Sequence, residues 1–311
     1  MQPNVISERF IFSLLTYIPT TAPVFALAML PMYAHAAPIG PGTITTPVTQ
    51  ASGDTTTIRG DTTIAPSGAG TAVTVSNGII ELDGPNIVVK ASGTGYGFNI
   101  DGTSALTSLV GTTDATLKIS TLGSTFSYGI WAHNPNQINT GNMVDVSNVS
   151  ISTVGNGSIG VVFNQYAKGV ISNLDIVTTG SRDPGNNNAG AYGISLQNSS
   201  QGTFDNVKIV TNGVGSSGLL NTDSSIVTID TINIKTNAAS SYGFNTQLGG
   251  VANIKNLTLE TMGTSSTGIL NTGLATFNGD NINLKINGDS SYGLNTQSGS
   301  STKINNASIH T

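Results

Sequence analysis

The 311-residue sequence contains no cysteine, and only 9% of its residues are charged. The lack of cysteine excludes a disulfide framework and thiol chemistry. A net charge of −5 leaves no basic stripe, so we expect no binding to nucleic acid. Few charges would indicate disorder only if apolar residues were also few, and 37% of the chain is hydrophobic. No pattern of residues indicates a catalytic group, a cofactor or a metal site.

The sequence does contain a regular repeat with a period of 25. Rows begin at positions 191, 216, 241, 266 and 291, and their first six residues are AYGISL, SSGLLN, SYGFNT, STGILN and SYGLNT. A fixed period of this size is typical of a solenoid, in which each unit buries its apolar face only against its neighbours.

Within each row, apolar and polar residues alternate. Positions 17 and 19 of the row that begins at 216 are Ile232 and Ile234, with Asn233 between them, and the other rows follow the same pattern. A period of two predicts a strand with one buried face. Three short strands and three corners fill one row. We therefore predict an all-β fold, a right-handed parallel β-helix with three short strands per coil.

A glycine occupies the third position of every row. We expect it to form a sharp corner, where a side chain would clash or where φ is positive. These predicted structural corners are Gly193, Gly218, Gly243, Gly268 and Gly293.

Two columns of charge test the register. Parallel stacking places the same position of successive rows side by side, so alternating signs put each charge next to its opposite. Position 20 alternates in this way, and so does position 15; the residues are Lys235, Glu260 and Lys285 in the first column, continued by His310, and Asp230, Lys255 and Asp280 in the second. Both columns support a period of 25.

The N-terminal region predicts export. An apolar stretch at 10–30 is followed by the small-x-small pattern that ends at Ala36, which is typical of a cleaved secretory signal. An uncleaved membrane anchor is the alternative, because the apolar stretch is long for a signal. We therefore assign 1–36 to a signal peptide, 37–69 to a linker and N-terminal cap, and 70–311 to the β-helix. The last strand lacks a corner or cap, so we expect a C-terminal truncation.

Three of the earlier coils are longer than this period and carry extra loops. The insertions lie within 99–114, 131–142 and 181–188. We expect the first two loops on neighbouring coils, on the same side, with the third as a candidate additional member. Loops on a rigid scaffold are common binding sites.

Candidate binding residues lie in and near these loops. Trp131, the only tryptophan, and His133 belong to the second loop, while Tyr96 and Tyr128 occupy the second position of their coils. Aromatic rings on a flat face are suited to glycans or to partner surfaces. The alternative is structural: each tyrosine packs on the glycine that follows it, and His133 is an exposed loop residue.

The tripeptide Arg59-Gly60-Asp61 matches a motif that integrin-binding proteins display on loops. A three-residue match also arises by chance, and this segment falls within the predicted cap.

A signal peptide, a cysteine-free β-helix rich in Gly, Asn, Ser and Thr, and the S-Y-G-[FL]-N-T-Q segments together resemble the passenger domain of bacterial autotransporters (type V secretion), with a pertactin-like or pectin-lyase-like β-helix. The resemblance covers 37–311. It implies export and passage through a C-terminal barrel in the outer membrane. The sequence contains no series of amphipathic membrane strands, so this C-terminal outer-membrane barrel is a missing partner, and its absence argues against self-translocation of the chain as written.

The resemblance implies a surface adhesin or self-association module without catalysis, at the cell surface or outside the cell. Its partners would be host or matrix glycans and proteins, or another copy of the chain. One alternative is a polysaccharide-degrading enzyme, since Asn221-Thr222-Asp223 is similar to a polygalacturonase motif, although Asp223 has no acidic residue at the same position of either adjacent coil. A non-functional remnant of a truncated gene, retained in the periplasm, is a further alternative.

Overall fold

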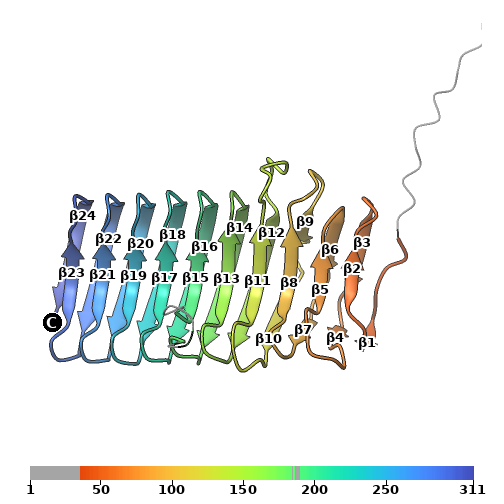
Figure 1. Cartoon of the computed structure of the whole chain (residues 1–311), viewed down its shortest axis with the longest axis horizontal. Helices are drawn as coiled ribbons and strands as arrows, with labels where there is room; N and C mark the ends of the chain where they lie inside the picture. The colour runs from red at the N-terminus through yellow and green to blue at the C-terminus, as the bar shows by residue number, and fades with distance from the viewer. Residues whose placement is uncertain (1–35, 184, 186–189) are drawn as a thin grey trace, which may run out of the picture. The chain divides into compact units, whose positions relative to one another are not determined.

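The computed structural model describes residues 36–183, 185 and 190–311, which form a right-handed parallel β-helix (Figure 1). Its 24 strands pair in parallel in two sheets, as the repeat predicted. Nearly all of the predicted signal peptide lies outside the described residues. Within the described residues, no helix is long and apolar enough to span a membrane.

One sheet contains the first strand of each coil, and we call it the short-strand sheet. Neighbouring strands in this sheet belong to successive coils, which lie side by side along the axis (Figure 1). Its ten strands are β2 (Val48–Gln50), β5 (Val73–Val75), β8 (Tyr96–Asp101), β11 (Tyr128–His133), β13 (Ile159–Asn164), β15 (Tyr192–Leu196), β17 (Ser217–Asn221), β19 (Tyr242–Thr246), β21 (Thr267–Asn271) and β23 (Tyr292–Thr296).

The other sheet contains the second and third strands of each coil. In the first coils these are separate, and they are β3 (Thr55–Arg59), β4 (Thr62–Ile64), β6 (Ile79–Asp83), β7 (Ile87–Ala91), β9 (Ser108–Gly111) and β10 (Leu117–Thr121). In later coils they run together into one bent strand, namely β12 (Val144–Thr153), β14 (Lys168–Thr178), β16 (Gln201–Thr211), β18 (Ile226–Thr236), β20 (Val251–Thr261), β22 (Thr276–Ile286) and β24 (Ser301–His310). Three strand segments per coil are thus retained.

Asparagine allows the bend in β12, β14 and β16. Asn148, Asn173 and Asn206 have φ values of 56°, 50° and 50°, a conformation that asparagine adopts more readily than most residues. Their side chains also connect the coils, because Asn173 Nδ2 donates to Asn148 Oδ1 at 3.0 Å and Asn206 Nδ2 donates to Asn173 Oδ1 at 2.8 Å.

The alternating residues form the core as predicted. In β18, Ile232 and Ile234 are buried, whereas Asn233 between them is exposed. Ile232 lies opposite Leu257 of the next coil, and Ile234 lies opposite Leu259. Stacking the same position in successive coils therefore builds a continuous apolar column along the axis.

The repeated glycines do not lie at corners, which corrects the prediction. Each is the second residue of a short strand: Gly193, Gly218, Gly243, Gly268 and Gly293 belong to β15, β17, β19, β21 and β23. The reason for glycine is close approach. A Cβ at Gly218 would lie 2.3 Å from Ile234 Cγ2 and 2.6 Å from the carbonyl oxygen of Gly243.

The first charge column forms as predicted and the second forms in part, because Asp280 is hydrogen-bonded to Asn305 and not to Lys255. Glu260 bridges Lys235 and Lys285, with N–O distances of 3.0 and 2.9 Å. In the second column, Lys255 Nζ lies 2.7 Å from Asp230 Oδ1. The register that the repeat predicted is thereby confirmed by side-chain contacts as well as by the strand pairing.

The segment 37–69, predicted as linker and cap, contains β1 (Gly42–Ile44) and the strands β2, β3 and β4. These last three strands pair with β5, β6 and β7, the strands of the next coil. β1 pairs with β4. The segment thus covers the edges of the coil that begins at 70, through strand pairing.

Candidate functional site

Two inserted loops lie on neighbouring coils, as predicted. Residues 102–107 follow β8 and residues 134–143 follow β11, its neighbour in the short-strand sheet. The loops are joined, because Asn139 Nδ2 donates a 2.6 Å hydrogen bond to the carbonyl oxygen of Thr107. Leu106 and Ile138 precede these two residues and are 56% and 48% exposed. The joined loops thus present two aliphatic side chains to solvent.

The third insertion lies at a different corner. The loops 102–107 and 134–143 follow short strands, whereas the insertion at 181–188 follows the long strand β14 and precedes β15. Its described part pairs with the next coil, since the Arg182 amide donates to the carbonyl oxygen of Val214. Residues 184 and 186–188 lie outside the described residues. The described part of this insertion is therefore no extension of the two joined loops.

Four predicted site residues lie close together on β8 and β11, the strands that precede the two loops. We call them the aromatic cluster: Tyr96, Tyr128, Trp131 and His133. The ring of Tyr128 lies 5.4 Å from that of Tyr96 and 5.2 Å from that of Trp131, with planes within 13° of parallel. The His133 ring lies 5.8 Å from Trp131. All four side chains are half-buried on the outer face of β8 and β11. Trp131 and His133 belong to β11 and not to the loop.

Burial governs the ionisation of the cluster. It raises the pKa of Tyr128 to about 12, with a smaller contribution from Tyr96. It lowers the pKa of His133, while the nearby charge of Asp101 acts in the opposite direction. The rings of Tyr128 and His133 are therefore neutral at neutral pH.

Polar acceptors lie beside the rings. His133 Nε2 is 3.8 Å from Asp101 Oδ1, too far for a hydrogen bond. Within the described residues, Asp101 Oδ1 and Asn99 Oδ1 are buried and accept no hydrogen bond. Asn99 and Asp101 lie opposite Trp131 and His133 in the strand pairing. Two polar acceptors thus lie on the strand that pairs with the strand of Trp131 and His133.

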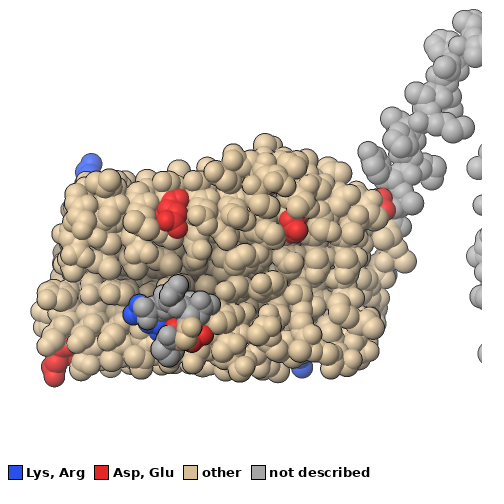
Figure 2. Space-filling model, in the orientation of Figure 1, with Lys and Arg blue, Asp and Glu red and all other residues tan. Residues whose placement is uncertain are grey.

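The face around this cluster is nearly free of charge. In the ten strands of the short-strand sheet, Asp101 is the only carboxylate, and there is no lysine or arginine. The view in Figure 2 likewise shows only scattered charged side chains. Lysine and arginine within strands belong instead to the other sheet. The strands of this sheet thus present a partly aromatic face on which Asp101 is the one charged residue besides the titratable His133.

Known proteins offer no template for this face. No family model, no curated protein and no solved structure matches the chain. Its function is therefore inferred from the geometry of its own residues.

Three further tyrosines, Tyr192, Tyr242 and Tyr292, begin short strands of later coils and stand apart from one another. Ser217 and Thr267 lie opposite them in the intervening coils, so Tyr192, Tyr242 and Tyr292 never occupy adjacent strands. Tyr292 is 61% exposed. Only Tyr96 and Tyr128 stack directly, because they alone occupy adjacent coils.

In the Arg59-Gly60-Asp61 tripeptide, Arg59 ends β3, and Gly60 and Asp61 form the tight turn before β4. The Gly60 and Asp61 amides donate to the carbonyl oxygens of Asp83 and Pro85 in the next coil. Asp61 Oδ1 also accepts a 3.0 Å hydrogen bond from Asn86 Nδ2. Arg59 and Asp61 are exposed, but the backbone is fixed against the next coil and does not protrude as a loop.

A line of carboxylates on the other sheet bears on the enzyme hypothesis. Asp205 and Asp230 occupy the same position of neighbouring coils and line a shallow groove of about 450 Å³ with Asp280 and Lys255. Asp205 occupies the same row position as Asp230, Lys255 and Asp280, although the predicted charge column did not include it. The hydrogen bond from Lys255 lowers the pKa of Asp230, so this carboxyl is ionised and is no proton donor at neutral pH. No group of three or more possible metal ligands occurs within the described residues.

Proposed function

We propose that this protein is an exported, non-catalytic adhesive module of the autotransporter-passenger kind, displayed at the cell surface. It would bind glycans or proteins of a host or matrix, or another copy of itself. The observation that carries the proposal is the aromatic cluster on a face with few charges, next to two joined loops. Tyrosine and tryptophan supply large contact areas with little loss of conformational entropy.

The chemistry of the face supports adhesion. Tyr96, Tyr128 and Trp131 are half-buried, so they already hold fixed orientations before a partner arrives. Preorganised aromatic groups of this kind often dominate the binding energy of an interface. Leu106 and Ile138 extend the contact area onto the loops.

The carboxylates support a non-catalytic role. Glycoside hydrolysis needs one carboxylic acid that donates a proton and a second carboxylate at a suitable distance. Asp230 is held ionised by Lys255, and its side chain is 45% exposed. We therefore assign these carboxylates to the surface and not to a catalytic pair.

Export is part of the proposal and has its own test. If residues 1–36 are a cleaved signal, the N-terminus of the protein recovered from the cell envelope begins at Ala37. An N-terminus at Met1 would contradict export by cleavage and would favour a membrane anchor.

The adhesive role is tested with beads coated with the purified protein. We expect the beads to aggregate or to adhere to surfaces coated with matrix glycans or proteins, and we expect Trp131→Ala to reduce this by about tenfold or more. Tyr292→Ala is the matched control, because Tyr292 occupies the same position of its coil as Tyr96 and Tyr128 but lies outside the cluster. Beads that neither aggregate nor adhere, or an equal loss in both variants, would contradict the proposal.

A further inference from the structure

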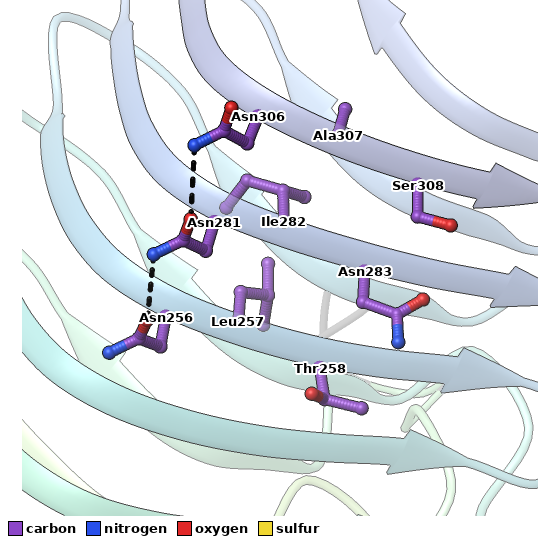
Figure 3. A pocket seen from close by; sticks show the side chains of 9 residues that line it. All are labelled: Asn256, Leu257, Thr258, Asn281, Ile282, Asn283, Asn306, Ala307 and Ser308. Carbon is purple, nitrogen blue, oxygen red and sulfur yellow. Dashed lines mark hydrogen bonds between the residues drawn. The ribbon is translucent and has the colours of Figure 1, made fainter.

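A second surface of the molecule has the form of a binding site. On the bent strands β20, β22 and β24, a groove of about 410 Å³ runs parallel to the axis and crosses three coils (Figure 3). One side is a row of three asparagines, and the other is a row of polar residues two positions later. The rows are Asn256, Asn281 and Asn306, and Thr258, Asn283 and Ser308.

The asparagine row is ordered by its own hydrogen bonds. Asn281 Nδ2 donates to Asn256 Oδ1 at 3.0 Å, and Asn306 Nδ2 donates to Asn281 Oδ1 at 3.1 Å. All three amides therefore point the same way along the axis (Figure 3). A side-chain amide has two N–H donors and two acceptor lone pairs. Asn281 uses one of each in the ladder, so one donor and one acceptor remain for a ligand.

The floor of the groove is apolar and its opposite side is polar. Leu257 and Ile282 lie between the two rows and are almost fully buried. Thr258 and Asn283 are exposed beyond them. A ligand in the groove would thus meet hydrogen-bonding groups at both edges and an apolar surface between them, repeated at every coil.

No residue that lines the groove is charged. In the nearest columns, Lys255 pairs with Asp230 at 2.7 Å and Glu260 pairs with Lys285 at 2.9 Å, whereas Asp280 accepts a 2.7 Å hydrogen bond from the neutral side chain of Asn305. The groove favours a neutral ligand.

We propose that this groove binds a linear, uncharged β-1,4-linked polysaccharide in extended form, parallel to the axis, with one sugar ring per coil. The polar groups recur every ~4.8 Å, which is close to the length of one pyranose ring; successive rings of such a chain are turned over, and each ring still presents hydroxyls at both edges. Pyranose rings present hydroxyls at their edges and C–H groups on their faces, which matches the two polar rows and the apolar floor. An extended peptide, with ~3.3 Å per residue, falls out of step with the coils.

The proposal is independent of the aromatic cluster, which lies on the other sheet. It is tested by isothermal titration of the purified protein with a cello-oligosaccharide and a chito-oligosaccharide of six rings. The comparison ligands are maltohexaose, whose chain is curved, and an oligogalacturonate, which is charged. We expect binding of one or both extended neutral chains and none of the other two.

Variants locate the binding. We expect Asn281→Ala and Asn283→Ala each to weaken binding by about fivefold to tenfold, because each removes hydrogen bonds to the ligand. Asn237→Ala is the matched control: Asn237 Nδ2 donates to Asn212 Oδ1 at 2.7 Å in a similar ladder outside the groove. A thermal unfolding midpoint for each variant shows whether the fold is retained.

Three results would overturn the proposal. These are the absence of binding to both neutral chains, a preference for the charged chain, and binding that survives Asn281→Ala and Asn283→Ala in folded protein. None of them affects bead aggregation or adhesion through Trp131, so failure of the groove and failure of the adhesive role are distinguishable.

Discussion

The carboxylate of Glu260 accepts a 2.9 Å hydrogen bond from Lys285, the residue directly opposite it in the next coil. Lys235 of the preceding coil lies 3.0 Å from the other carboxylate oxygen. The bonds from Lys285 and Lys235 lower the pKa of Glu260 from 4.5 to about 2. The residues at this position of successive coils thus form a chain of alternating charges along the axis.

This contact predicts a pH-dependent stability. The pKa of Glu260 is lower in the folded state, so its stabilisation is complete above about pH 4.5 and is lost as the pH falls toward 2. We expect the wild-type protein to be more stable than Glu260→Gln at pH 7, by about 1 kcal/mol or less, because the pairs are partly exposed. The thermal midpoints of both proteins should converge by pH 2. A difference that is as large at pH 2 as at pH 7 would disprove this account.

The glycines of the short strands predict a steric effect. Gly218→Ala adds a Cβ that meets Ile234 and the Gly243 backbone at 2.3 and 2.6 Å, so we expect a loss of about 1–3 kcal/mol in the free energy of unfolding. Gly68→Ala is the control, since a Cβ at Gly68 has no atom within 4 Å. Chemical denaturation measures both. Equal midpoints for the two variants would refute the close-approach explanation.

A column of buried hydroxyls predicts that a substitution stabilises the fold. The Oγ1 of Thr236 has no hydrogen-bond partner within the described residues, and the side chain is fully buried. The same holds at the equivalent position of the neighbouring coils, in Thr121, Thr153, Thr178, Thr211 and Thr261. Thr236→Val keeps the shape and removes the unsatisfied group, so we expect a gain of about 1 kcal/mol or more.

Thr236→Ser is the matched control for this gain. It keeps the hydroxyl and deletes a buried methyl group, so we expect a loss of about 1 kcal/mol. If Thr236→Val lowers the unfolding midpoint instead, the hydroxyl column is bridged by internal water and the explanation fails.

The pair His133 and Asp101 predicts a titration. Burial lowers the pKa of His133 below 6.5, and Asp101 opposes the shift. We expect the imidazole proton resonances to titrate below pH 6.5, and the midpoint to move further down in Asp101→Asn, because the opposing charge is gone. NMR titration of both proteins measures this. An upward shift in Asp101→Asn would contradict the assigned role of Asp101.

The repeat largely predicted the fold, because parallel stacking places residues that are one period apart in the sequence next to each other in space. Once the period is 25, Ile232 must lie near Leu257 and Lys235 near Glu260, and both pairs are opposite one another. The buried faces and the charge columns follow from the same shift of 25 residues between successive coils. For the candidate site, row position also placed Tyr96 beside Tyr128 and the two inserted loops on neighbouring coils.

The asparagine row of the groove was visible in the sequence but was not recognised. Asn206, Asn256, Asn281 and Asn306 share one position, interrupted by Thr231. Asparagine at the same position of several coils therefore indicated a row of side chains joined by hydrogen bonds. That the ladder borders a groove depended on the bend of the strand, for which the pattern of apolar residues contains no information.

The sequence by itself determined the period, the strands and the face on which each side chain lies, because alternation and stacking are local rules repeated along the axis. Only the tertiary structure decided the distances between side chains. It brought Trp131 and His133 onto the same face as Tyr96 and placed Gly218 inside a strand against Ile234. These contacts depend on the curvature of each coil and on side-chain rotamers, which a linear pattern does not specify.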